Sequence, residues 1–449
     1  MPALRSNIKY LTASLFFILI VITISYFTAR HHTLILFTQY TLLFGLYMIF
    51  LQKINDVNIN RIGRYTGILA RLSLLLLVPN LSDDIFRFIW DGHLVASGLN
   101  PFSQLPSYWL NIPDTPSGIN NELLLKFGAK DTYSCYPPIN QFIFWISIII
   151  PGNRIFWNIL IMRLFILTAE FGNFWIIPRL LKKYKLPVSM GLIWYLNPLV
   201  ILELTGNLHF EAIMVFFLLL SLYYFDKTKW ILSAIFMGLA VSIKLIPLIF
   251  LPLFFKRIGI KNTFLYSLLT ITILLVQFIP FVGSDPIYGF FSSLSLYFHK
   301  LEFNASVYYL LREVGYWVTD NNIIQALGPF LAIVALTGII IYSKKEDAKQ
   351  NNLATSALWV LMIYVSLSTT LHPWYITSML VLNIFTRFRF TIVWSYFIFF
   401  TYAGYSVEGF QEPSLLIFIE YAMVYGVMLV EIYNKVPDKF NTWFKVKNI

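Results

Sequence analysis

Long apolar runs constrain this chain more than any other feature of its sequence. The runs are about 15 to 24 residues long, and short polar or basic breaks separate them. About 20 apolar residues in a helix cross the hydrocarbon core of a bilayer, where the backbone must satisfy its own hydrogen bonds. With 58% hydrophobic and 12% charged residues, the sequence predicts an all-α, polytopic transmembrane helical bundle. We expect a single integral membrane domain over residues 1–449.

The apolar runs predict about 12 to 14 helices. The predicted segments are 8–28, 33–52, 65–80, 137–151, 155–178, 187–203, 208–225, 230–254, 262–282, 323–342, 353–371, 374–386, 391–406 and 414–433. Two alternatives stay open in the middle of the chain. One of 137–151 and 155–178 can be a half-crossing, and 230–254, interrupted by Lys244 and Pro247, can be one span or a short hairpin.

The net charge of +11 lies mainly in Arg and Lys clusters beside the apolar runs. Such clusters are typical of cytoplasmic loops, so no nucleic-acid partner is predicted and the N-terminus is expected inside. Residues 81–136 then form a first large outer loop and 283–322 a second. The outer loops carry an acidic excess, and the C-terminal lysines are expected inside: Lys435, Lys439, Lys445 and Lys447.

Residue types also limit the chemistry. The single cysteine, Cys135, excludes an intramolecular disulfide and a cysteine-based metal site. No phosphate-binding GxxxxGK loop is present, so nucleotide-driven chemistry lacks support. Asp83 and Asp84 could ligate a hard cation together with Asp91, but no second acidic cluster accompanies them. We therefore predict neither a metal nor another cofactor.

The first outer loop contains an amphipathic stretch. Its apolar residues at helical spacing are Ile85, Phe86, Ile89 and Trp90, and its polar residues are Asp83, Asp84, Arg87 and Asp91. We expect a helix along the membrane interface whose carboxylates face water or a cavity. Residues 285–316 repeat this pattern, which predicts interfacial helices in both outer loops.

Several short motifs occur in one order over residues 80 to 375. They are Ser82-Asp83-Asp84-x-x-Arg87-Phe88-x-Trp90-Asp91-Gly92, Gly98-x-Asn100-Pro101-Phe102, Tyr136-Pro137-Pro138-x-x-Gln141, Asn197-Pro198-Leu199, Gly206-Asn207-x-His209-x-Glu211 and Lys244-Leu245-x-Pro247. Together they resemble the polyprenol-phosphate-sugar-dependent integral membrane glycosyltransferases of the GT-C fold, particularly bacterial mannosyltransferase-like members. Glu211 departs from the pattern, because many relatives have Asp there.

This resemblance implies that an acidic residue of the first outer loop is the catalytic base. A carboxylate would take the proton of an acceptor hydroxyl while a hexose, mannose in the first instance, leaves a polyprenyl phosphate. Cations would stabilise the leaving phosphate, and a single displacement would invert the anomeric centre. The expected acceptor is a glycolipid, a polysaccharide or a protein on the outer face of a bacterial inner (plasma) membrane, among membrane lipids.

Candidate site residues follow from the same motifs. Asp84 is the first choice for the base and Asp83 the second, although either could instead cap the helix. The candidates for the lipid phosphate are Arg87, Lys244, Arg312 and His372, with Asp91 orienting Arg87 or the Gly92 turn. Those for the sugar or the acceptor are His209, Glu211, Glu302, Asn304 and Tyr375. Lys244 could also extend to the lipid headgroups, and Tyr375 could belong to an aromatic belt.

Two other classes remain as alternatives. A transporter or lipid flippase would suit many helices with buried charges, but transporters often show internal repeats and none is evident here. A polysaccharide polymerase or ligase would be expected to use arginines and a histidine on a late outer loop, whereas here the carboxylates come early.

Overall fold

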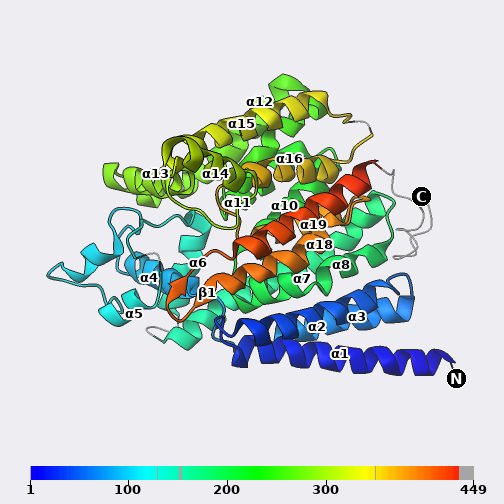
Figure 1. Cartoon of the computed structure of the whole chain (residues 1–449). Helices are drawn as coiled ribbons and strands as arrows, with labels where there is room; N and C mark the ends of the chain where they lie inside the picture. Colours follow the sequence, from blue (N-terminus) through cyan, green and yellow to red (C-terminus); the bar gives the residue numbers. More distant parts are fainter. Residues whose placement is uncertain (1, 129, 151–153, 349, 434–449) are drawn as a thin grey trace. The chain divides into compact units, whose positions relative to one another are not determined.

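The computed structural model describes residues 2–128, 130–150, 154–348 and 350–433. The predicted C-terminal lysines lie outside this range. The chain, drawn as a ribbon in Figure 1, is described as two compact units. Unit 1 comprises Met1–Leu81, Phe171–His209 and His372–Ile449, and unit 2 comprises Ser82–Glu170 and Phe210–Leu371. Each unit is described separately below.

Unit 1 contains the first and last helices of the described chain. Its elements are α1 (Pro2–Phe27), α2 (Thr33–Leu51), α3 (Val57–Ser73), the later part of α7 (Ile155–Lys183), η2 (Val188–Gly191), α8 (Leu192–Tyr195), α9 (Pro198–Val200), η3 (Ile201–Gly206), α17 (Tyr375–Asn383), α18 (Phe390–Phe397), η6 (Ile398–Gly404), β1 (Tyr405–Ser406), β2 (Gly409–Phe410) and α19 (Ser414–Tyr433). The two short strands pair antiparallel, with Tyr405 opposite Phe410.

Unit 2 carries both predicted outer loops. Its elements are α4 (Asp84–Ala96), η1 (Pro106–Leu110), α5 (Asn121–Leu125), α6 (Pro138–Ile149), the first part of α7, α10 (Glu211–Phe225), α11 (Trp230–Val241), η4 (Ile246–Phe254), α12 (Phe255–Gln277), η5 (Ile279–Phe281), α13 (Ser284–His299), α14 (Val307–Thr319), α15 (Ile324–Lys345) and α16 (Leu353–Leu367).

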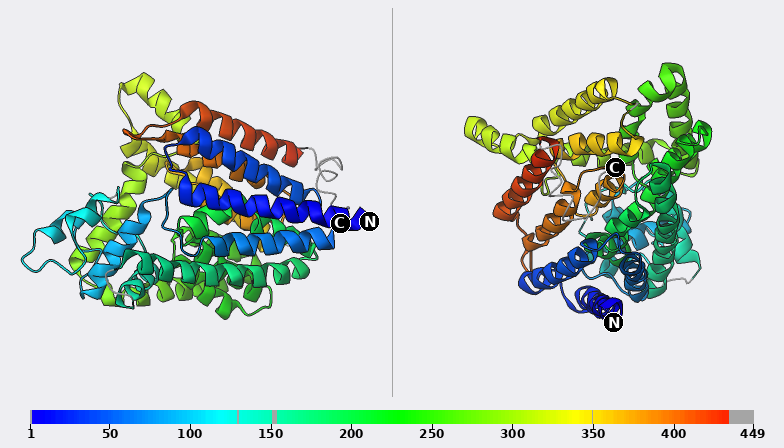
Figure 2. Two further views of the ribbon diagram at one scale, coloured as in Figure 1. Left: turned by 90° about the horizontal axis from the view of Figure 1, so that it is seen from below. Right: turned by 90° about the vertical axis from the view of Figure 1, so that its right-hand side faces the viewer.

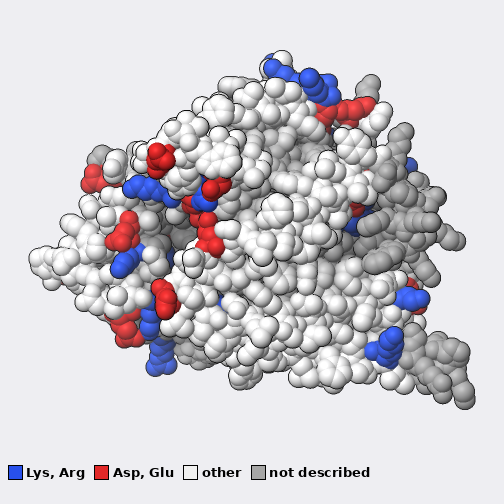
Figure 3. Space-filling view, in the orientation of Figure 1, with Lys and Arg blue, Asp and Glu red and all other residues white. Residues whose placement is uncertain are grey.

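The predicted all-α, polytopic class is confirmed. Among the described residues, six helical stretches are long and apolar enough to cross a membrane: Asn7–Phe27, Thr33–Leu51, Ile155–Lys183, Ile246–Gln277, Ile324–Lys345 and Ser414–Tyr433. A seventh span results if the pair Val188–Tyr195 and Pro198–Gly206, bent by 54°, is counted as one. Along α19 the surface is almost free of charge, whereas acidic and basic side chains gather over the 97–136 segment of unit 2 (Figure 3).

Several helices are shorter than the apolar runs that predicted them. α6 has 12 residues, or about 18 Å, and cannot cross a hydrocarbon core of about 30 Å. This length favours the half-crossing among the alternatives for 137–151. The run 230–254 is also divided, because α11 ends at Val241 and the 3₁₀ helix η4 begins only at Ile246, after Lys244.

The third helix is displaced from its predicted position at 65–80. α3 begins at Val57 because the Asp56 carboxylate accepts hydrogen bonds from the backbone N–H groups of Asn58 and Ile59 at 2.9 and 3.1 Å. It ends at Ser73, although the apolar run continues. A capping aspartate therefore outweighs hydrophobicity in setting where this helix starts.

In unit 1, α3 packs against α8 and η3, which lie on either side of the break in the helix pair Val188–Tyr195 and Pro198–Gly206. α1, α2 and α3 lie side by side (Figure 2). On the face that α3 turns to α8, a Cβ added at Gly67 would lie 2.2 Å from the backbone oxygen of Tyr195. One turn later, the fully buried Arg71 donates a hydrogen bond to the same oxygen at 2.7 Å. The missing side chain of Gly67 thus leaves room for the close approach, and the guanidinium of Arg71 satisfies the carbonyl at the break.

Candidate active site

The predicted catalytic carboxylates lie where α4 begins in unit 2. Asp84 is the first residue of the helix and Asp83 precedes it, and both are half-buried. The Asp83 side chain makes no capping hydrogen bond. The alternative that Asp83 caps the helix therefore finds no support in its geometry, and both residues stay candidates for the base.

One turn into α4, Arg87 and Asp91 form a buried ion pair. Their side chains are 4% and 0% exposed, and Arg87 Nε lies 2.9 Å from Asp91 Oδ1. Arg87 also donates through Nη1 to the backbone oxygen of Thr132 at 2.9 Å. The expectation that the carboxylates of this helix face water or a cavity is therefore wrong for Asp91. Burial of the pair is possible because the two side chains neutralise each other and because the 97–136 segment supplies further partners.

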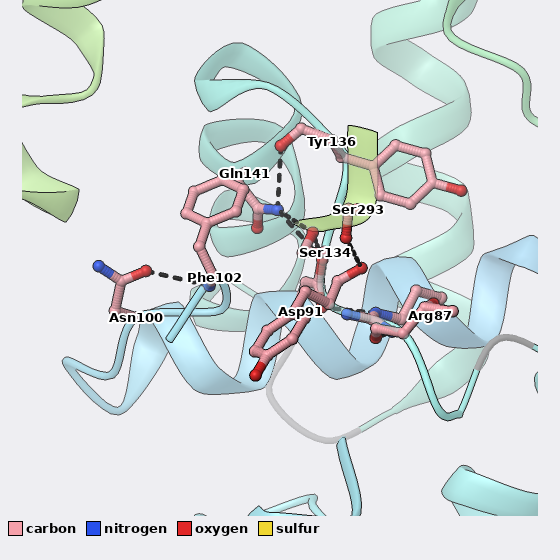
Figure 4. Close-up of polar contacts among 10 residues, drawn as sticks. Arg87, Asp91, Asn100, Phe102, Ser134, Tyr136, Gln141 and Ser293 are labelled. Carbon is pink, nitrogen blue, oxygen red and sulfur yellow. Dashed lines mark hydrogen bonds and ion pairs between the residues drawn. The ribbon is translucent and has the colours of Figure 1, made fainter. Parts of the chain in front are cut away.

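Two residues that the sequence did not single out complete this network. Gln141, in the first turn of α6, donates to Asp91 Oδ2 at 3.1 Å and to Ser134 Oγ at 2.9 Å (Figure 4). The Ser134 hydroxyl donates to the same Asp91 oxygen. Gln141 belongs to the Tyr-Pro-Pro-x-x-Gln motif, which was the available signal, but a pairing over fifty residues cannot be read from helical periodicity.

An aromatic cluster joins α4 to α6 and to the start of α10. Phe88 stacks on Phe144 with ring centroids 4.8 Å apart, and Phe210 lies edge-on to both rings. Close approach is also required at Gly92, where an added Cβ would lie 2.7 Å from the Phe144 backbone oxygen. This cluster, Phe88, Phe144, Phe210 and Tyr136, is the aromatic wall of the site.

Lys244 and Glu211 form a second ion pair beside the aromatic wall. Glu211 follows Phe210 directly and is 3% exposed, whereas the Lys244 side chain is 28% exposed. The backbone before Lys244 is held by α6, because Asn140 donates to the Ile243 oxygen at 2.7 Å. Consecutive residues of α6, Asn140 and Gln141, therefore fix the Lys244 segment and Asp91.

Charges from these elements converge on the segment that precedes α6. Burial raises the pKa of the Cys135 thiol, while the cations Arg87 and Lys244 act to lower it and Asp84 to raise it. Burial, followed by the negative charge of Asp84, raises the pKa of the Tyr136 hydroxyl. Acidic and basic side chains thus surround Cys135 and Tyr136, and both groups stay protonated near neutral pH.

The candidates in the second outer loop bind one another. Glu302 accepts hydrogen bonds from Tyr308 Oη at 2.8 Å and from Asn322, and it pairs with Arg312. Asn304 has a positive φ of 46° in the strand-like contact of its neighbour Phe303 with Thr370. These bonds tie α14 to the loops around it, and the roles of Glu302, Asn304 and Arg312 with substrate stay predictions.

The remaining candidates lie in unit 1, where three aromatic rings stack. His209 lies 3.7 Å from the Trp374 ring, and Trp374 lies 4.5 Å from His372. His209 Nε2 is 3.4 Å from the buried carboxylate of Glu203. Tyr375 packs edge-on against His372 at 5.6 Å. Unit 1 thus brings together His209, His372 and Tyr375 through Trp374.

No group of three or more His, Cys, Asp or Glu side chains suited to hold a metal ion occurs among the described residues. The site of unit 2 therefore offers a half-buried carboxylate, two cations and protonated donors. Such a set can take a proton from a hydroxyl and stabilise a leaving anion. Together with the helical bundle, it is typical of a membrane enzyme that transfers groups from a charged carrier.

Comparison with known proteins gives the family. The family model described as alpha-(1->6)-mannopyranosyltransferase, N-terminal domain, matches residues 15–257, which is more than half of the chain. The chain belongs to this family, and the predicted kinship with GT-C mannosyltransferases is confirmed. The matched stretch contains Asp83, Asp84 and Lys244, whereas the candidates from Glu302 onward lie beyond it.

Two curated relatives are mannosyltransferases by name. GPI mannosyltransferase 1 of Candida albicans is 33% identical over 115 residues, which cover 20% of this chain and 29% of the relative. Alpha-(1->6)-mannopyranosyltransferase A of Mycobacterium tuberculosis is 27% identical over 193 residues, which cover 42% of this chain and 35% of the relative. The chain thus spans about a third of the length of each relative.

Proposed function

We propose that the chain is a membrane glycosyltransferase that transfers a hexose, mannose in the first instance, from a polyprenyl-phosphate-linked donor. The acceptor is a glycan, glycolipid or protein on the outer face of the inner (plasma) membrane. One arrangement carries the proposal: the half-buried Asp84 begins the helix whose Asp91 is bonded to Gln141 of α6, and the neighbouring Asn140 holds the backbone before Lys244. Membership of a mannopyranosyltransferase family supports the choice of sugar.

In this mechanism Asp84 is the base. Its carboxylate takes the proton of the acceptor hydroxyl as the new glycosidic bond forms and the bond to the phosphate breaks. The lipid phosphate leaves with the electron pair of that bond, so no general acid is needed. Because attack and departure occur on opposite faces of the anomeric carbon, the product has the opposite anomeric configuration to the donor.

Lys244 is the better placed of the two cations to receive the phosphate. The Lys244 side chain is 28% exposed, whereas the Arg87 side chain is 4% exposed and its guanidinium is bonded to Asp91 and Thr132. Glu211 holds Lys244 from the buried side. We therefore assign phosphate stabilisation to Lys244 and positioning of the 132–136 segment to Arg87.

The test is transfer of radiolabelled mannose from synthetic polyprenyl-phosphate mannose to a membrane extract. The purified variants are wild type, Asp83→Asn, Asp84→Asn and, as a matched control, Asp114→Asn, which removes an exposed acid of the same loop. We expect Asp84→Asn to lose about 10² to 10⁴ of the rate, and Asp114→Asn to match wild type. Parallel donors carry glucose and arabinose.

Each alternative has its own result. Loss of transfer in Asp83→Asn alone would identify Asp83, and not Asp84, as the catalytic base. Undiminished transfer in both variants would contradict a base at the start of α4. No transfer from any lipid donor would favour a transporter or flippase, and joining of preassembled lipid-linked glycans would favour a polymerase or ligase.

A further inference from the structure

Tyr136 has no role in the mechanism above, yet it is the half-buried member of the aromatic wall. Its ring lies edge-on to Phe88 at 4.9 Å and to Phe144 at 5.7 Å. Its backbone oxygen accepts a hydrogen bond from Gln141 at 3.3 Å. The ring is therefore fixed from both sides, by α4 and by α6.

The hydroxyl of Tyr136 points away from the network that holds its backbone. In Figure 4 the ring extends away from Gln141, Asp91 and Ser134, and no contact is drawn at its oxygen. Asp84 and Phe88 are four residues apart on α4 and thus share a helix face. Phe88 contacts the Tyr136 ring, so the face of α4 that faces this ring also carries Asp84 one turn earlier.

Electrostatics supports the same placement. Asp84 has the largest charge effect on the pKa of Tyr136, ahead of Arg87, whereas both Arg87 and Lys244 rank before Asp84 at Cys135. The raised pKa keeps the Tyr136 hydroxyl protonated, so that this hydroxyl can donate a hydrogen bond, whereas the Asp84 carboxylate can only accept one.

We propose that the Tyr136 hydroxyl donates a hydrogen bond to a hydroxyl group of the donor sugar and so helps to select and orient that sugar. A phosphate oxygen is the less suitable partner, because its negative charge would be repelled by Asp84. A sugar hydroxyl is neutral, so it could accept a hydrogen bond from Tyr136 without repulsion from Asp84. The aromatic ring of Tyr136 would also give the sugar an apolar surface to pack against. This inference rests on the proposed function.

The experiment compares wild type with Tyr136→Phe, which keeps the ring and removes only the hydroxyl. Tyr133→Phe is the matched control, because it removes a phenol three residues away in the same segment. Each protein is assayed with polyprenyl-phosphate mannose and with four analogues that lack the 2-, 3-, 4- or 6-hydroxyl. Ratios of kcat/KM between donors are taken within one preparation, so an inactive fraction in any variant cancels.

We expect Tyr136→Phe to lose about 5- to 10-fold in kcat/KM with the full donor, as for one hydrogen bond. With the one analogue that lacks the contacted hydroxyl, Tyr136→Phe and wild type should be equal, while the other three analogues keep the difference. An equal loss with all five donors, or no loss at all, would overturn this inference alone. Failure of wild type to use any lipid donor would overturn the proposed function with it.

Discussion

Loss of the Asp91 carboxylate should destabilise unit 2 strongly. This carboxylate is 0% exposed and accepts hydrogen bonds from Arg87 Nε at 2.9 Å, from Gln141 Nε2 at 3.1 Å and from Ser134. Asp91→Ala leaves the guanidinium of Arg87 buried without its anion. Removing one partner of a buried ion pair costs about 3–5 kcal/mol.

The structure indicates the lower end of that range. Arg87 would keep its bond to the Thr132 oxygen and its position over the Phe127 ring, so we expect about 3 kcal/mol for Asp91→Ala. Asp91→Asn keeps the shape and loses the charge, which should cost about 1.5–3 kcal/mol. Adding Arg87→Met to Asp91→Ala removes the unpaired cation and should restore about 1–2 kcal/mol.

The assay is unfolding of the purified chain in mixed micelles by titration with dodecyl sulfate, combined with limited proteolysis of the 97–136 segment. The control is Glu122→Gln, which breaks the solvent-exposed pair with Lys126 and should leave both readouts unchanged. A free-energy change below about 0.5 kcal/mol for Asp91→Ala, or additive effects in the double variant, would refute the reasoning.

Two further predictions concern steric fit and pH. Gly67→Ala places a Cβ 2.2 Å from the Tyr195 backbone oxygen and should lower thermal stability and yield. Gly45→Ala, with nothing within 4 Å, should be neutral when both are compared by fluorescence-detected gel filtration, and equal behaviour would contradict the close contact. Burial raises the pKa of Cys135 above its usual 9.0, and only the thiolate is alkylated. Iodoacetamide labelling, followed by mass spectrometry, should therefore stay slow at pH 8 and be half-maximal only above pH 9, whereas fast labelling at pH 8 would exclude the raised pKa.

The long helices were predictable because their sequences carry one dominant signal. α1, α2 and α19 each consist of a nearly uninterrupted apolar run of membrane length, so hydropathy alone locates them. α3 was misplaced because the carboxylate of Asp56 caps its first turn, and hydropathy contains no information on caps. The predicted helix over 187–203 is instead divided at Asn197-Pro198 and bent by 54°, because proline lacks the backbone N–H that would continue the helix, and hydropathy does not register this.

The sequence supplied the candidate residues of the site but not the burial of each one. A helical period of polar residues is the same for a water-facing stripe and for a buried ion pair, so the Asp91 carboxylate was expected to face water or a cavity. Their burial depends on Ser134 and Gln141, which are distant in sequence. The choice of base between Asp83 and Asp84 depends on contacts with the substrate, and the periodicity of the sequence carries no information on those contacts.

The adjacent residues Asn140 and Gln141 give the first turn of α6 a mechanical property. One holds the segment of Lys244 through Ile243, and the other holds Asp91 on the helix that begins with Asp84. A tilt of α6 would therefore move Asp91 and the Lys244 segment in the same direction, so the distance between them would change little. A single residue inserted between Asn140 and Gln141 would rotate one of these side chains by about 100° relative to the other, so both hydrogen bonds could not be kept without a change in α6.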